Sequence, residues 1–263
     1  MSKMAKLKKI LKGMRSVVIA YSGGLDSAFL VKVAVDSLGK SNVLAVTARS
    51  ETYPASEYNE AVWIVKMIGA RHAVIKTKEL EIGHFKSNPV NRCYYCKREL
   101  FKELDRIRKA RGMKYLLDGA NYDDLKDVRY GRIAAKELGV RSPLVDARLA
   151  KADIRKHSKI YGLPTWNKPP LACLASRVPF HTAINAKDLN RIDKAEAYLR
   201  SLGFKQVRVR LHKDIARLEL LPGDLKKAVK LRSAITDKLR KLGFVYVALD
   251  LQGYRTGSMH EAA

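Results

Sequence analysis

Residues 22–27 read Ser-Gly-Gly-Leu-Asp-Ser and follow the apolar run 17–20 after the single residue Tyr21. Two adjacent glycines let the backbone turn sharply and bring its N–H groups close to a phosphate. The expected helix after them adds the positive end of its dipole, and serine hydroxyls can donate to phosphate oxygens. Asp26 would repel a polyphosphate unless Mg²⁺ lay between them, so it is a candidate catalytic residue through a direct or indirect metal contact. The predicted nucleotide-binding residues here are Ser22, Gly23, Gly24, Asp26 and Ser27.

This loop differs from the two commonest glycine-rich nucleotide loops. No Gly-Lys-Ser/Thr follows the glycines, and the spacing is not Gly-x-Gly-x-x-Gly. The sequence therefore disfavours γ-phosphoryl transfer.

The chain has three cysteines, an odd number that argues against a disulfide framework. Cys93 and Cys96 form a Cys-x-x-Cys pair, and Cys173 lies in a proline-rich stretch. A closed zinc site would need a fourth ligand, such as His84 or His181. Three thiolates on a 4Fe-4S cluster would instead leave one iron free for an exogenous sulfide. The spacing leaves both kinds of site open.

Several arginines could bind an anion. Arg177 follows Cys173 by four residues, and Arg208 and Arg210 alternate along an expected strand, so they face the same side. Guanidinium groups placed in this way can clamp a phosphate or carboxylate. Glu219 on the partner strand is equally able to form a salt bridge with them.

The expected elements alternate, with strands at 17–20, 43–47, 73–76 and 115–118, a shorter strand before Pro143, and helices at 28–38, 57–68, 97–111 and 132–138. Alternation of this kind predicts an α/β fold with a parallel, doubly wound sheet. Ligands bind at the carboxyl ends of such strands, where the loop at Ser22 lies. Arg49 and Gly119 follow two other strands, so we expect both near the nucleotide.

A second domain is expected after the prolines at 169, 170 and 179. It would contain helices at 187–202 and 223–242 and strands at 207–211, 216–220 and 245–249. We expect residues 1–180 to form the nucleotide domain with the cysteine-bearing loops. Residues 181–263 would form a small α+β domain for substrate binding or oligomerisation.

Composition limits the function classes only coarsely. The 263 residues carry a formal net charge of +26, which attracts phosphates, nucleotides or RNA without choosing among them. No apolar run approaches the roughly 20 residues that cross a bilayer, and no signal-peptide pattern follows the basic start. We therefore expect a cytoplasmic protein without a membrane partner.

Residues 22–27 resemble the PP-loop of the ATP pyrophosphatases, which are adenine nucleotide alpha hydrolase-like in fold and cleave ATP to AMP and pyrophosphate. Further segments point to one family within this superfamily. They resemble the LarE family of ATP-dependent sulfur transferases and comprise residues 88–97, 139–144, 162–180, 207–210 and 215–219. This resemblance implies a homo-oligomeric enzyme that uses ATP and Mg²⁺. Its reaction would adenylate a carboxylate of a pyridinium dicarboxylate mononucleotide and convert it to a thiocarboxylate, a step toward the nickel-pincer cofactor.

The resemblance also implies roles for the remaining residues. Cys173 would be catalytic, either sacrificing its sulfur or joining Cys93 and Cys96 on a 4Fe-4S cluster that presents sulfide from a donor, and the three cysteines favour the cluster. The residues implied to bind the substrate phosphate are Ser176, Arg177, Arg208 and Arg210. Tyr130 and His181 depart from the family pattern, which has proline and glycine there.

Two alternatives stay open. The net charge and the cysteines also suit a PP-loop sulfurtransferase that thiolates tRNA, although no RNA-binding module is recognisable. A nucleotide-binding or iron–sulfur carrier without catalysis is the other, and ATP turnover would distinguish it.

Overall fold

The computed structural model describes residues 1–125, 130–170 and 172–260. These residues form two compact units. The first contains Met1–Ser50, Glu57–Glu79 and Asn91–Leu171, and the second contains Glu51–Ser56, Leu80–Val90 and Ala172–Ala263. The second unit therefore includes two short segments from the first hundred residues besides its long C-terminal part.

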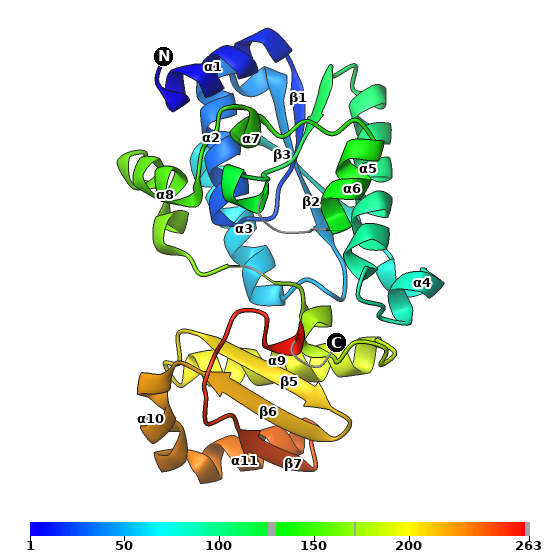
Figure 1. Ribbon diagram of the computed structural model, residues 1–263, viewed down its shortest axis with the longest axis vertical. Coiled ribbons are helices and arrows are strands. Elements are labelled where there is room, and N and C mark those ends of the chain that lie inside the picture. Colours follow the sequence, from blue (N-terminus) through cyan, green and yellow to red (C-terminus); the bar gives the residue numbers. More distant parts are fainter. Residues whose placement is uncertain (126–129, 171, 261–263) are drawn as a thin grey trace. The chain divides into compact units, whose positions relative to one another are not determined.

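The first unit is built on a four-stranded parallel sheet. Its strands are β1 (Val17–Ala20), β2 (Val43–Arg49), β3 (Arg71–Lys76) and β4 (Tyr115–Leu117), in the order β3-β2-β1-β4 (Figure 1). The chain thus winds outward from β1 to β3 and then crosses to the far side of β1. Such a reversal places the ligand-binding crevice at the carboxyl ends of β1 and β4. The expected parallel α/β sheet is confirmed.

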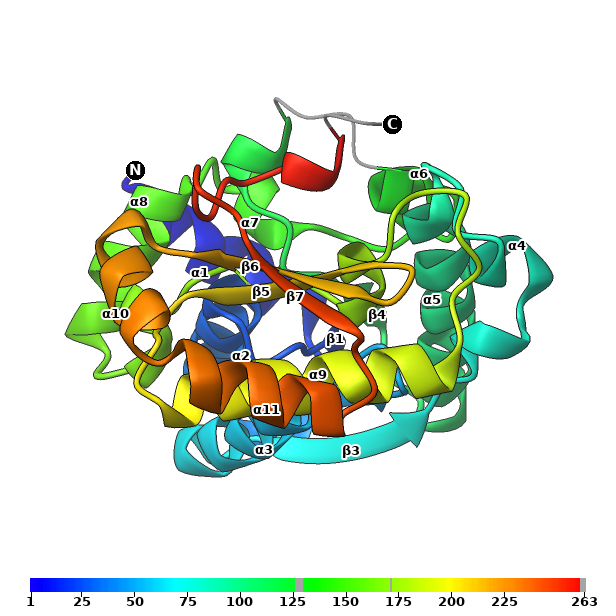
Figure 2. The same ribbon diagram turned by 90° about the horizontal axis from the view of Figure 1, so that it is seen from below.

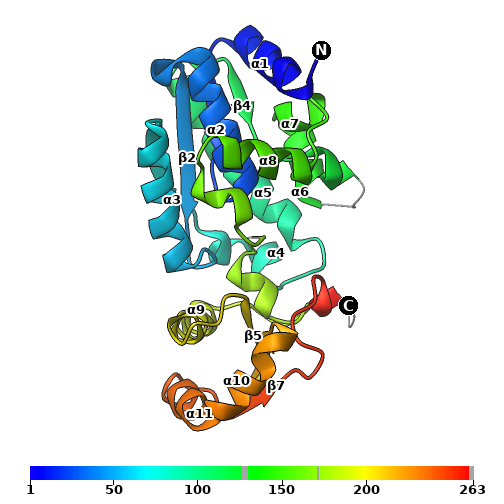
Figure 3. The same ribbon diagram turned by 90° about the vertical axis from the view of Figure 1, so that its left-hand side faces the viewer.

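Helices cover both faces of this sheet because successive side chains of β1 point to opposite sides. Val17 and Ile19 pack into a core with the helices of one face, and Val18 packs with those of the other. The first face carries α1 (Lys3–Met14), α2 (Leu25–Leu38), α3 (Ala55–Ile68), α7 (Pro143–Asp146) and α8 (Lys151–Ile160), and the second carries α5 (Arg92–Ala110) and α6 (Tyr130–Glu137) (Figures 1 and 3). Strands buried on both faces explain the continuous apolar runs.

The short strand expected before Pro143 is reduced to a single bridge. Arg141 pairs with Leu117 in parallel, and its N–H donates to the Leu116 carbonyl at 2.9 Å. Pro143 then begins α7 at once, because proline has no N–H to give to a ladder and suits the first turn of a helix.

The second unit has a three-stranded sheet in the order β5-β6-β7, with β5 antiparallel to β6 and β7 parallel to it. Two helices, α9 and α11, cover one face of it, and the C-terminal segment runs over the other (Figures 2 and 3). The elements are α4 (Gly83–Lys86), α9 (Ala186–Ser201), β5 (Val207–His212), β6 (Ile215–Leu220), α10 (Leu225–Lys230), α11 (Arg232–Lys241) and β7 (Tyr246–Leu249).

The single helix expected over 223–242 is instead two helices. Leu231, between α10 and α11, has φ −91° and ψ 11°, outside helical geometry. Among the described residues, no helix combines the length and apolar character that a bilayer crossing requires.

Candidate functional site

Hydrogen bonds of two serines stabilise the conformation of the loop between β1 and α2. The Ser22 N–H donates to Ser27 Oγ at 3.2 Å, and the two hydroxyl oxygens are 3.1 Å apart. Ser22 Oγ also accepts from the Gly24 N–H at 3.4 Å. Gly24 precedes α2 as its N-cap and has no side chain to satisfy the N–H groups of the first turn. N–H groups at a helix N-terminus of this kind can accept an anion, so the loop has the local geometry that the predicted nucleotide site requires.

Two glycines of this site cannot be replaced without displacing neighbours. Gly23 has φ +67°, and a Cβ there would lie 2.4 Å from the Ala61 Cβ of α3. A Cβ on Gly119, which follows β4, would lie 3.1 Å from the Ser27 nitrogen. Gly119 therefore lies directly against the start of α2, so the carboxyl ends of β1 and β4 meet where the strand order reverses.

One carboxylate oxygen of Asp26, in the first turn of α2, has no hydrogen-bond partner in the described part of the chain. This oxygen, Oδ1, is buried. Burial raises the pKa of Asp26, and the nearby Asp124 raises it further, while Lys151 opposes them. A buried carboxylate oxygen without a donor suits a divalent cation, which prefers oxygen ligands. The residues here therefore fit the Mg²⁺ of a metal–nucleotide complex.

The segment after β4 brings further polar groups to the first unit's site. Burial raises the pKa of Asp118, which accepts from Ser142 Oγ at 2.7 Å and from the Ala120 N–H at 3.2 Å. A tight turn follows, in which the Asn121 N–H donates to Asp124 Oδ2 at 3.1 Å. This turn is what holds Asp124 close enough to influence Asp26.

Arg49 lies at the end of β2, and its guanidinium carbon is 4.8 Å from the centre of the Tyr58 ring. The Arg49 carbonyl accepts from the Thr77 N–H at 3.1 Å, which extends the pairing of β2 with β3. The side chain is exposed on the edge where the nucleotide loop lies.

The Cys-x-x-Cys pair belongs to the first unit and occupies the first turns of α5. Cys93 is exposed and Cys96 is half-buried, and neither forms a disulfide. Residues three apart on a helix are neighbours, so both sulfurs can reach one metal or cluster. Cys96 Sγ lies 4.0 Å from Oε1 of the buried Glu79. No group of three His, Cys, Asp or Glu side chains in the described ranges forms a metal site.

Cys173 belongs to the second unit and is also a free, exposed thiol. Its carbonyl accepts from Ser176 Oγ at 2.8 Å and from Arg177 Nη1 at 3.0 Å, and the next N–H, of Leu174, donates to the Thr52 carbonyl at 2.8 Å. The peptide group that follows Cys173 is therefore held by hydrogen bonds at both its carbonyl and its N–H.

Arg177 uses all three guanidinium nitrogens within the chain. Nε and Nη2 donate to the two carboxylate oxygens of Glu196, and Nη1 donates to the Ala172 carbonyl at 2.8 Å and to the Cys173 carbonyl. Burial opposes the charge, but Glu196 raises the pKa of Arg177 above its ordinary value. Arg177 thus positions the loop that carries Cys173.

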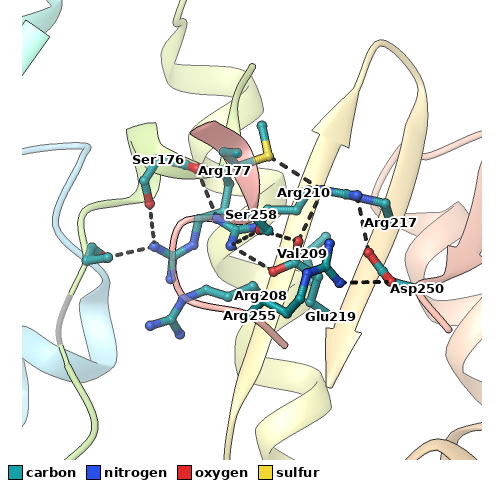
Figure 4. Close-up of polar contacts among 12 residues, drawn as sticks. Ser176, Arg177, Arg208, Val209, Arg210, Arg217, Glu219, Asp250, Arg255 and Ser258 are labelled. Atoms are coloured by element: carbon teal, nitrogen blue, oxygen red, sulfur yellow. Dashed lines mark hydrogen bonds and ion pairs between the residues drawn. The ribbon is translucent and has the colours of Figure 1, made fainter. Parts of the chain in front are cut away.

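Arg208 and Arg210 are both buried on the same side of β5 (Figure 4). Arg210 donates to Glu219 Oε2 at 2.7 Å and to the Ser176 carbonyl at 3.0 Å, so the possible salt bridge to Glu219 is confirmed for Arg210. Burial first, and then the charges of Arg177 and Arg210, lower the pKa of Arg208 to about 10. Positive charge is therefore crowded here, and an anion would relieve it.

Sequence reasoning missed Glu196, Ser258 and Lys151. Glu196 had a detectable signal, because it falls on the apolar stripe of α9 with Leu189, Ile192 and Leu199. A carboxylate on such a stripe is buried and must find a charged partner. Ser258 and Lys151 carried no comparable signal, since ordinary loop and helix-start residues surround them.

His181, one of the two departures from the family pattern, has φ +62°. This left-handed region favours glycine, which explains the family's glycine at that position. Tyr130, the other departure, begins α6, where a proline would also fit the first helical turn.

Comparison with known proteins agrees with this geometry. The NAD synthase family matches residues 4–108, which include the nucleotide loop. A functionally uncharacterized protein of Synechocystis is 41% identical over 98% of this chain and 97% of its own. The pyridinium-3,5-bisthiocarboxylic acid mononucleotide synthase of Lactiplantibacillus plantarum is 37% identical over 99% of this chain and 94% of its own. A functionally uncharacterized protein of Methanocaldococcus jannaschii is 30% identical over 97% of this chain and 98% of its own.

Two relatives of high coverage therefore share more than a third of their residues with this chain over both units. The resemblance to the LarE family is confirmed, and the local match to NAD synthases reflects the PP-loop that they share. The chain belongs to the LarE family of ATP-dependent sulfurtransferases, within the PP-loop superfamily.

Proposed function

We propose that this enzyme adenylates a carboxylate of a pyridinium dicarboxylate mononucleotide and replaces the activated oxygen with sulfur, in the biosynthesis of the nickel-pincer cofactor. The observation that carries the proposal is the identity of 37%, over both units, to the Lactiplantibacillus synthase. The reducing cytoplasm is the expected compartment, since none of the three cysteines forms a disulfide.

The first unit would perform the activation. The N–H groups after Ser22 and the start of α2 would hold the β- and γ-phosphates, and Asp26 would hold Mg²⁺. The substrate carboxylate attacks the α-phosphorus, the bond to the bridging oxygen breaks, and pyrophosphate leaves with its charge stabilised by the loop. Arg49 and Gly119 would border the bound nucleotide, and Asp118 would fix the loop after β4 through its bond to Ser142.

The second unit would orient the mononucleotide. We propose that Ser176, Arg208 and Arg210 contact its phosphate. Arg177 would hold the loop that carries Cys173 in place and would add its positive charge to the pocket. Burial, and after it the charges of Arg177 and Arg210, lower the pKa of Arg208 to about 10, and this proximity of buried guanidinium groups supports an anionic occupant. Two negative charges on a phosphate would offset the excess of guanidinium over carboxylate.

Sulfur transfer would follow by one of two routes. In the sacrificial route, Cys173 Sγ attacks the acyl carbon and AMP leaves. The Cα proton of the cysteine is then removed and its Cβ–S bond breaks, which yields the thiocarboxylate and dehydroalanine. In the other route, Cys93, Cys96 and Cys173 hold a 4Fe-4S cluster, which would supply a sulfide from an exogenous donor. The presence of three cysteines that form no disulfide suits the cluster route.

A pyrophosphate-release assay with ATP, Mg²⁺ and the dicarboxylate mononucleotide tests the activation step. We expect AMP and pyrophosphate in equal amounts, with a mass increase of the product that corresponds to exchange of oxygen for sulfur. Formation of ADP and phosphate would contradict the proposal. Sedimentation of the same sample would test the homo-oligomer that the family implies.

The net charge of +26 supports one competing function, thiolation of tRNA. The same assay with tRNA in place of the mononucleotide distinguishes the two. Pyrophosphate release that depends on tRNA, with a thiolated nucleoside in the digest, would favour the competitor.

A further inference from the structure

The C-terminal segment 253–258 covers the arginine-bearing face of the second unit's sheet (Figures 2 and 4). It is fixed at its start, where the Tyr254 N–H donates to the Leu220 carbonyl at 2.7 Å. Gly253 has φ +72°, and a Cβ there would lie 2.7 Å from that carbonyl oxygen. Glycine is therefore required for the chain to turn onto this face.

Ser258, at the end of this segment, is buried between Arg210 and Glu219. Its hydroxyl donates to Glu219 Oε1 at 2.7 Å and accepts from Arg210 Nη2 at 3.1 Å. Arg217 Nη2 donates to the same Glu219 oxygen at 3.1 Å. Oε1 of Glu219 is thus occupied twice, and only Oε2 pairs with Arg210.

This sharing leaves one donor of Arg210 without an acceptor. A carboxylate and a guanidinium otherwise form two parallel hydrogen bonds. Here Nη1 is used by the Ser176 carbonyl and Nη2 by Glu219 and Ser258, whereas the buried Nε–H has no acceptor in the described ranges. Arg210 is only 5% exposed, and a buried donor of this kind normally has an acceptor.

The same segment covers the second arginine. The guanidinium carbon of Arg208 lies 5.5 Å from the centre of the Tyr254 ring, within the range of a cation–π contact. Tyr254 and Ser258 thus contact Arg208 and Arg210 respectively, although they lie more than forty residues from them in sequence.

We propose that segment 253–258 is a wall of the substrate-phosphate pocket, and that Ser258 is a positioning residue which keeps the Nε–H of Arg210 available to the phosphate. Without the Ser258 hydroxyl, Glu219 can take two donors of Arg210, and Nε–H or Nη1 is drawn away from its present direction. The identity of the occupant as the mononucleotide phosphate rests on the proposed function, whereas the anion pocket itself rests on these contacts.

The test uses the arginine Nε–H signals in NMR spectra of the full-length protein, titrated with inorganic phosphate. The Arg210 signal is assigned by its loss in Arg210→Lys. In the wild type we expect this signal to shift on titration. In Ser258→Ala it should move before any phosphate is added, and the titration midpoint should rise about tenfold, the effect of weakening one charge-assisted bond. Ser258→Thr, which keeps the hydroxyl, should restore the signal position.

Thr256→Ala is the matched control, because Thr256 is an exposed hydroxyl residue of the same segment. Its titration should equal that of the wild type. An Arg210 signal that ignores phosphate in the wild type, or equal midpoints in Ser258→Ala and Thr256→Ala, would overturn the anion pocket.

Steady-state kinetics separate this inference from the proposed function. Ser258→Ala should raise KM for the mononucleotide about tenfold while kcat and KM for ATP stay unchanged. An unchanged KM for the mononucleotide would overturn the assignment of the pocket to the substrate phosphate. If the wild type does not turn over the mononucleotide at all, the proposed function fails, and the phosphate titration alone decides the pocket.

Discussion

Arg177 and Glu196 pair through two parallel hydrogen bonds, Nε to Oε1 at 2.8 Å and Nη2 to Oε2 at 3.0 Å, with both side chains buried. The third nitrogen of Arg177 holds the Cys173 carbonyl, so a carboxylate on α9 fixes the loop that presents the thiol. Glu196 also accepts from the Val209 N–H of β5 at 3.1 Å. One buried carboxylate therefore joins a helix, a strand and the cysteine loop.

Replacing Glu196 by Gln should destabilise the protein strongly. A buried guanidinium without its charged partner costs about 3–5 kcal/mol, which thermal unfolding would register as a lower Tm. Glu103→Gln is the control, because Glu103 pairs with Arg106 on an exposed helix face, where such pairs contribute about 0–1 kcal/mol. Equal Tm values for the two variants would contradict the structural role of Glu196.

The same pair predicts a pH dependence of stability. Burial would raise the pKa of Glu196, but Arg177 and Arg200 hold it below its ordinary value. Because the folded state lowers this pKa, the stabilisation is complete above pH 4.5 and is lost as the pH falls below that value. Denaturant unfolding of the wild type between pH 7 and pH 3 should show this loss. In Glu196→Gln, the free energy of unfolding should lack the part of this decrease that comes from protonation of Glu196.

Gly23→Ala should destabilise the nucleotide loop. The new Cβ would lie 2.4 Å from the Ala61 Cβ, and φ is +67°, so the loop or α3 must shift at a cost of about 1–3 kcal/mol. Gly13→Ala is the opposite case, because Gly13 lies within α1 with open space around it, and alanine favours a helix by up to about 1 kcal/mol. We expect a lower Tm and weaker ATP binding for the first variant only.

Asp26→Asn should separate stability from activity. Since burial raises the pKa of Asp26, ionisation of this group costs stability as the pH rises above that pKa, and the neutral amide removes the cost. The variant should therefore have a higher Tm at pH 7 without ligands, yet release pyrophosphate about 100-fold more slowly. Asp36→Asn, on the exposed face of α2, should leave the rate unchanged. A rate for Asp26→Asn equal to that of the wild type would remove Asp26 from the site.

Iron and sulfide analysis after anaerobic purification distinguishes the two sulfur routes. If Cys93, Cys96 and Cys173 hold a cluster, the wild type should be brown, and Cys93→Ala should lose iron and the associated absorbance. A colourless wild type that loses the mass of one sulfur atom per turnover would instead support sacrifice of Cys173. Cys93→Ala should then retain its single-turnover activity.

Much of the first unit follows from local sequence. The β1 run, the two glycines and the first residues of α2 are contiguous, so a turn at a helix N-terminus and its affinity for phosphate are set within a few residues. The alternation of strands and helices predicts that the strands of the sheet run parallel to one another. The predictions of a strand before Pro143 and of a single helix over 223–242 were wrong. The length of an element depends on strand pairing and side-chain packing, which the intrinsic preferences of its residues do not determine.

The sequence by itself determined the chemical groups of this protein: an anion-binding loop, an acidic residue beside it, three thiols and a set of arginines. Only the tertiary structure decided which arginine is engaged and which keeps a free donor. Arg177 is neutralised by Glu196 from α9, whereas Arg210 shares Glu219 with Ser258 from the far end of the chain. Hydrogen-bond geometry and burial set these pairings, and both arise only when segments distant in sequence pack together.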